Sequence, residues 1–209
     1  MADAAFHTLA GRVEAELRDR GSRFLAHAVP IADRPAAEAF LAAEAEAYRD
    51  ASHVVPAFVL HDGTAYSNDA GEPAGSAGAP MLRAIEGARL ADVAAVVVRW
   101  FGGTKLGMGG LVRAYGGALA LALEDAATRE AIAAVRLNVH YPYPRTAAVL
   151  RVVNAHGADA LEHGHEADGG RVTFLLPTDR RDAFDVALRD ATQGAVAAVE
   201  LGRGVILRA

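Results

Sequence analysis

The chain has 209 residues, of which 52% are hydrophobic and 22% charged, a balance typical of a folded protein and unlike that of a disordered one. It contains no cysteine, which excludes disulfide frameworks, thiolate metal sites and cysteine nucleophiles. The formal net charge of −5 argues against a protein that coats nucleic acid over its whole surface, but it allows a local basic site.

No apolar run approaches the roughly 20 residues that span a bilayer. The start of the chain also lacks the basic and then apolar pattern of a signal peptide. We therefore expect a cytoplasmic protein without a membrane partner. Alanine occurs 49 times and raises helix propensity everywhere, so the periodicity of the larger apolar residues is the better guide to secondary structure.

The first part of the chain predicts a mixture of helices and strands. Phe6, Leu9, Val13 and Leu17 are spaced near 3.6 residues, which predicts an amphipathic helix or a loosely docked segment over residues 1–20. The elements expected after it are a strand over 23–31, a helix over about 33–50, a strand over 54–60, a return strand over 65–67, a helix over 80–87, a strand over 93–100 that is buried on both faces, and a helix over 111–127.

A domain boundary is expected near Ala134. The pattern beyond it predicts a strand over 135–141, a helix over 144–156, strands over 160–167 and 171–177, a helix over 179–193 and a strand over 196–207. This β-α-β-β-α-β order is that of a ferredoxin-like domain. The sequence therefore predicts two α+β domains, residues 1–134 and 135–209.

Two glycine-rich segments stand out, residues 69–78 (DAGEPAGSAG) and 99–113 (RWFGGTKLGMGGLVR). A glycine loop that leads from a buried strand into a helix directs free N–H groups outward, and the helix dipole adds partial positive charge there. Such a loop suits an anion such as phosphate. No acidic residue lies between Val93 and Leu123, although the surrounding domain is acidic.

The predicted anion-binding or nucleic-acid-binding site consists of three cations and five glycines: Arg99, Gly102, Gly103, Lys105, Gly107, Gly109, Gly110 and Arg113. The first glycine segment is expected to be the partner loop, through Gly71, Glu72, Gly75, Ser76 and Gly78. Neither nucleotide-binding glycine fingerprint is present, which disfavours ATP and NAD. Tight packing without any ligand is the alternative explanation of these glycines.

Three further groups of polar residues suggest chemistry. Asp69 and Glu72 are close enough in sequence to act as acid and base or to hold Mg²⁺, although an aspartate there also suits a cap of its own turn. Ser76 has no obvious histidine partner. The run His163-Gly164-His165-Glu166 is spaced like metal ligands, but we expect it to be solvated in a hairpin, and we expect no metal and no cofactor.

Residues 71–80 and 98–115 resemble the signature of the IMPACT/YigZ family, and the likeness extends over about residues 20–130. Residues 135–209 resemble, more weakly, the C-terminal domain of bacterial YigZ-like members. The resemblance implies a first domain of the α+β type shared with RNase PH and a ribosomal protein. It implies a ferredoxin-like second domain similar to the last domain of elongation factor G. Ala70 stands where many members have a second acid, which counts against a metal site of two aspartates.

Together with this resemblance, which implies a role related to translation, the glycine-rich basic loop predicts a non-enzymatic regulator that binds RNA or a ribosome-associated partner through that loop. The alternative is an enzyme that acts on a phosphorylated or nucleotide substrate, with Asp69 and Glu72 as acid–base or Mg²⁺-binding groups. A third interpretation is a protein-interaction module centred on the second domain. The sequence leaves the oligomeric state open.

Overall fold

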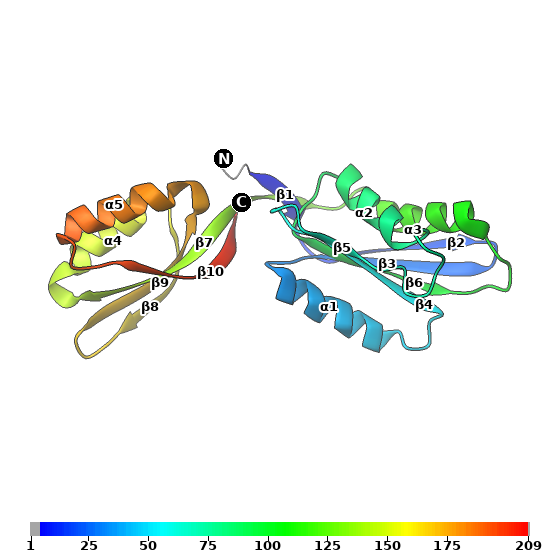
Figure 1. Ribbon diagram of the computed structural model, residues 1–209, viewed down its shortest axis with the longest axis horizontal. Helices are drawn as coiled ribbons and strands as arrows, with labels where there is room; N and C mark the ends of the chain where they lie inside the picture. Colours follow the sequence, from blue (N-terminus) through cyan, green and yellow to red (C-terminus); the bar gives the residue numbers. More distant parts are fainter. Residues whose placement is uncertain (1–4, 209) are drawn as a thin grey trace. The chain divides into compact units, whose positions relative to one another are not determined.

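The computed structural model describes residues 5–208, which form two compact units, Phe6–Glu130 and the chain from Ala131 onward. Both units are mixed α+β structures (Figure 1). The division lies four residues before the boundary expected near Ala134, because strand β7 (Thr128–Pro142) runs through that position without a break.

The first unit is built on an antiparallel sheet with the strand order β2-β3-β6-β4-β5. After β1 (Phe6–Leu9), its elements are β2 (Val13–Asp19), β3 (Ser22–Pro30), α1 (Arg34–Ala47), β4 (His53–Val59), β5 (Ala65–Ser67), α2 (Gly78–Gly87), β6 (Val93–Trp100) and α3 (Gly107–Leu123). The strands predicted over 65–67 and 93–100 are confirmed with the same bounds.

Helices cover both faces of this sheet (Figure 1). Helices α2 and α3 enclose one core with Phe24 and Val97, and α1 encloses a smaller core with Phe58 and Ala94. Every residue of β6 except Trp100 is buried, as its continuous apolar run predicted. An antiparallel sheet often leaves one face exposed to water. Here β6 is buried on both faces because helices cover both sides of the sheet.

The helix predicted over residues 1–20 is wrong, and residues 1–4 of that range lie outside the described part of the chain. The rest forms β1 and β2. Along β2 the partly buried residues alternate with exposed ones, because Val13, Ala15 and Leu17 face the core beside α2 and α3. The helix-like spacing arose from the larger apolar residues of two short strands read as one segment.

Helix α3 begins at Gly107, four residues before its predicted start, so the preceding loop is limited to residues 101–106. Gly107, Gly109 and Gly110 therefore belong to the first turn of the helix and not to the loop in which the sequence placed them. Their backbone N–H groups are thus among those that an α-helix leaves without a partner at its start.

The second unit has the predicted β-α-β-β-α-β order. Its elements are β7, α4 (Thr146–Ala155), β8 (Asp159–His165), β9 (Gly169–Pro177), α5 (Arg181–Thr192) and β10 (Ala198–Leu207), with short 3₁₀ helices at Tyr143–Arg145 and Thr178–Arg180. The strand order is β8-β9-β7-β10, and α4 and α5 lie on one face of this sheet (Figure 1). Their apolar residues pack against the sheet and form the core of the unit. Among the described helices of both units, none is long and apolar enough to cross a membrane.

Candidate functional site

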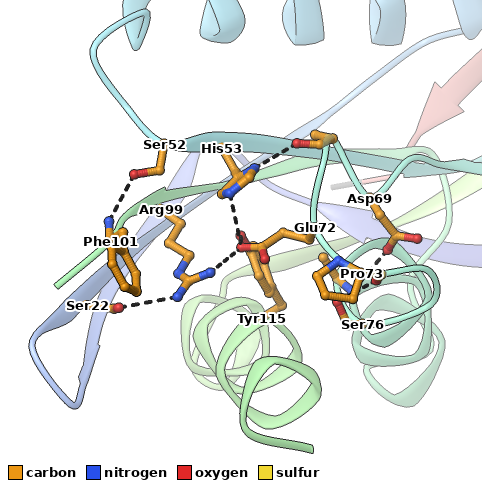
Figure 2. A network of polar contacts seen from close by, with 12 residues as sticks. Ser22, Ser52, His53, Asp69, Glu72, Pro73, Ser76, Arg99, Phe101 and Tyr115 are labelled. Atoms are coloured by element: carbon orange, nitrogen blue, oxygen red, sulfur yellow. Dashed lines mark hydrogen bonds and ion pairs between the residues drawn. The ribbon is translucent and has the colours of Figure 1, made fainter. Parts of the chain in front are cut away.

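A buried carboxylate, Glu72, lies at the centre of a polar network in the first unit (Figure 2). Its Oε1 accepts hydrogen bonds from Nη1 of Arg99 at 2.5 Å and from the hydroxyl of Tyr115 at 2.7 Å. The side chains of Glu72 and Arg99 are only 4% and 6% exposed, and Tyr115 is fully buried. The network thus joins three segments: the loop before α2, the end of β6 and the middle of α3.

The loop that follows β6 is held on two sides. Oγ of Ser22 accepts hydrogen bonds from the backbone N–H of Gly102 at 3.1 Å and from Nη2 of Arg99 at 3.4 Å. Oγ of Ser52 accepts the backbone N–H of Phe101 at 3.0 Å. A Cβ on Gly102 would lie 1.9 Å from the backbone of Gly21, so only glycine fits this close approach. Figure 2 shows the contacts of Ser22 with Arg99 and of Ser52 with Phe101 beside the Glu72 network.

His53 joins the same network, although the sequence analysis gave it no chemical role. Its Nδ1 lies 2.8 Å from the carbonyl oxygen of Ala70, which can only accept, so Nδ1 carries the proton. Its Nε2 lies 3.8 Å from Oε1 of Glu72. Strand register could have placed His53 in the network. His53 pairs with Arg99 across β4 and β6, and the side chains of paired residues lie on the same face of a sheet.

Asp69 caps the start of α2. Its Oδ2 accepts the N–H of Gly75 at 2.7 Å, and its Oδ1 accepts those of Ala77 and Gly78 at 3.0 and 2.9 Å. Burial alone would raise the pKa of Asp69, but the three backbone donors together outweigh it and lower the pKa. Ser76 is buried, and its hydroxyl donates to the carbonyl of Pro73 at 2.6 Å. These bonds are structural ones within the first glycine segment.

Burial also determines the charge state of Tyr115. It raises the pKa of Tyr115, and the hydrogen bond to the Glu72 carboxylate raises that pKa further, so the phenol stays a neutral donor. The Arg99 guanidinium carbon lies 5.4 Å from the Phe24 ring and 5.5 Å from the Phe101 ring. The structure therefore places Arg99 inside the unit, bound to Glu72, and not among the surface cations.

The start of α3 is the exposed part of the predicted site. Gly102, Gly103, Lys105, Gly107, Gly109 and Arg113 are exposed, whereas Gly110 is buried. Within residues 5–208, Lys105 and Arg113 make no hydrogen bond or ion pair, and no side chain caps the first turn of α3. Phe101 and Met108 are exposed beside these cations. We call Phe101, Lys105, Gly107, Met108, Gly109 and Arg113 the α3-start surface.

The comparison with known proteins covers both glycine segments. The model of the Impact N-terminal domain matches residues 20–123. The "IMPACT family member in pol 5'region" of Thermus thermophilus is 40% identical over 174 residues, which are 83% of this chain and 94% of that protein. The chain belongs to the IMPACT family. This family is linked to translation regulation in general.

Two other relatives in the IMPACT family match different shares of the chain. YigZ of Escherichia coli is 29% identical over 180 residues, 84% of this chain and 87% of YigZ. YvyE of Bacillus subtilis is 40% identical over 114 residues, 54% of this chain and 52% of YvyE. A solved structure titled "Crystal structure of an hypothetical protein" has a TM-score of 0.71 at 27% identity, and covers 95% of this chain and 97% of that one.

The buried ion pair predicts a large and non-additive effect on stability. Glu72→Gln leaves the Arg99 cation buried without a carboxylate and is expected to lower the free energy of unfolding by about 3 kcal/mol. The double variant Glu72→Gln/Arg99→Met should lose at least about 1 kcal/mol less than the sum of the single variants. Urea unfolding followed by the fluorescence of Trp100, the one tryptophan, measures this for the first unit. If the losses in the free energy of unfolding were strictly additive, Glu72 and Arg99 would not be energetically coupled.

The Asp69 cap predicts a pH-dependent contribution. Because the pKa of Asp69 is lowered on folding, its stabilisation is present above the ordinary aspartate pKa of about 3.9 and is lost as the pH falls through the lower folded value. Asp69→Asn should cost about 1 kcal/mol at pH 7 and less at pH 3, where part of the stabilisation by the carboxylate has been lost. Urea unfolding at both pH values tests this, with the exposed Asp125→Asn as the matched control. A loss of equal size at both values would show that the carboxylate charge is irrelevant.

Proposed function

We propose that this IMPACT family member is a non-enzymatic regulator related to translation, and that it binds single-stranded RNA through the α3-start surface. The observation that carries the proposal is the uncapped, exposed start of α3 between Lys105 and Arg113, two cations without a partner in the described chain. The uninterrupted absence of acidic residues from Val93 to Leu123 supports it, because nothing in this stretch repels an anion.

The electrostatics favour a phosphate. The first N–H groups of α3 have no intrahelical partner, and the helix dipole places partial positive charge at them. A Cβ on Gly109 would lie 3.6 Å from Nη1 of Arg113, so this guanidinium lies against the first turn. Lys105 lies just before the same turn. A phosphate here would meet backbone donors and two cations, as phosphates do at other helix N-termini.

Phe101 supplies an aromatic surface beside these charges. Phe101 is 50% exposed, and its backbone N–H donates a hydrogen bond to Oγ of Ser52. Stacking of a base on an exposed ring is tolerant of sequence and adds affinity to phosphate contacts. Trp100 is less suited, because its indole N–H donates to Asp50 and the Arg23 guanidinium lies over its ring at 4.6 Å.

The positions of the two carboxylates support binding over the enzymatic alternative. Both oxygens of Asp69 are used by the cap of α2. Glu72 is buried and accepts from Arg99 and Tyr115. Within the described residues, neither belongs to a cluster of three or more acidic or histidine side chains that suits a metal.

The proposal includes the finer assignment of the two units. The strand order β10-β7-β9-β8, with α4 and α5 on one face, supports a ferredoxin-like second domain over residues 135–209, similar to the last domain of elongation factor G. For residues 1–134 we propose the α+β type shared with RNase PH and a ribosomal protein.

The test is the fluorescence anisotropy of a labelled single-stranded RNA at about 50 and 200 mM salt, a range over which phosphate contacts change affinity strongly. Each phosphate contact on a single strand adds about 0.7 to the slope of log affinity against log salt. The variant Lys105→Ala/Arg113→Ala should therefore bind more weakly at low salt and lose about 1.4 from that slope.

The matched control is Arg34→Ala/Arg49→Ala, which removes two exposed cations on and beside α1, across the sheet from α3. This control should bind RNA as the unmodified protein does. An equal loss in both variants would show that only net charge matters. Absence of RNA binding by the unmodified protein would overturn the proposal and favour a protein partner.

A further inference from the structure

A second cluster of chemistry-bearing side chains lies in the second unit, independent of the α3-start surface. Nε2 of His140 on β7 lies 3.4 Å from Oε2 of Glu166 and 3.5 Å from Oδ1 of Asp168. The three atoms all lie within 4.8 Å of one another. Glu166 and Asp168 come from the turn between β8 and β9, and the pairing of β7 with β9 brings His140 to that turn.

The backbone holds these three groups in place. The N–H of Glu166 donates to the carbonyl of Gly169 at 2.8 Å, and the N–H of Gly169 donates back at 3.4 Å, which closes a tight turn. The hydroxyl of Tyr143 donates to the carbonyl of Glu166 at 2.8 Å. A Cβ on Gly169 would lie 2.1 Å from the carbonyl oxygen of Tyr141, so the hairpin packs closely against β7. The donor atoms therefore lie on a short, hydrogen-bonded turn and the neighbouring strand, and not on a long loop.

Their spacing fits a metal ion better than direct hydrogen bonds. Hydrogen bonds between nitrogen and oxygen are usually 2.7–3.2 Å long, shorter than both separations from His140. Zinc binds nitrogen and oxygen ligands at about 2.0–2.2 Å, which places the corners of a tetrahedron about 3.3–3.6 Å apart. The separations of 3.4 and 3.5 Å fall in this range.

The donor set also indicates the kind of ion. An imidazole nitrogen favours zinc and similar transition metals, whereas magnesium and calcium prefer oxygen donors alone. The Arg171 guanidinium lies on the other oxygen of Glu166, with 3.9 Å between Nε and Oε1, which leaves Oε2 directed to His140. The two carboxylates of Glu166 and Asp168 match the charge of a divalent cation.

We propose that His140, Glu166 and Asp168 bind a divalent transition-metal ion, preferably Zn²⁺, with a fourth position for water. The sequence predicts that the nearby residues His163, His165 and Glu166 are solvated in a hairpin. Among the described residues, only Glu166 of that run belongs to the cluster, and both histidines are exposed outside it. The histidine that completes the set comes from another strand, which spacing along the chain does not reveal.

The test is a titration of tag-free protein with Zn²⁺ at pH 7, by competition with a chromogenic chelator. We expect one ion per chain and a loss of affinity of more than about tenfold in His140→Ala and in Asp168→Asn. His163→Ala and His165→Ala are the matched controls, since each removes an exposed imidazole of β8 and should leave the affinity unchanged. Circular dichroism checks that every variant is folded.

Binding of Co²⁺ provides a second readout, because a cobalt ion with four tetrahedral ligands absorbs visible light far more strongly than hydrated cobalt. The absorbance should be present in the His163→Ala protein and absent in His140→Ala. Zinc binding that His140→Ala leaves unchanged would overturn the proposal. So would an equal weakening in all four variants, which would indicate only unspecific surface binding.

Discussion

The ion pair between Glu72 and Arg99 is the interaction on which the rest of the first unit depends. A charge this deeply buried is costly unless it is paired and hydrogen-bonded, and Tyr115 adds the bond that completes the arrangement. The pair forms only when the loop before α2, the end of β6 and α3 lie in their native positions. It therefore holds together segments of the chain that share no backbone hydrogen-bond ladder.

Because of this ion pair, the two glycine segments have different roles in the structure. The first segment contains the buried Glu72 and also Asp69, which caps α2. Both carboxylates are hydrogen-bonded within the unit. The second segment follows β6, and the hydroxyls of Ser22 and Ser52 accept hydrogen bonds from its backbone. It then continues into the exposed first turn of α3. The basic residues of this segment differ in the same way, because Arg99 is buried and paired with Glu72, while Lys105 and Arg113 are exposed.

The sequence predicted most elements, since long apolar runs and turn residues determine them locally. It failed where short elements adjoin: β1 and β2 together imitate a helical period, and the glycines at the start of α3 were read as loop. At the candidate site, the sequence singled out Glu72 and Arg99 but did not reveal that their side chains are buried. Strand alternation held the missing information, because Arg99 shares the face of Val97, which packs under α2 and α3. The positions of His53 and His140 beside their neighbours depend on strand register, which only the folded sheets reveal.

The most direct test of the account is to record the amide signals of isotope-labelled protein by nuclear magnetic resonance while a short single-stranded RNA is added. The account predicts that the signals of Gly107, Met108 and Gly109 move and saturate together with the side-chain signal of Arg113, while those of α1 stay in place. Movement confined to α1 or to the second unit, with the first turn of α3 unchanged, would contradict it.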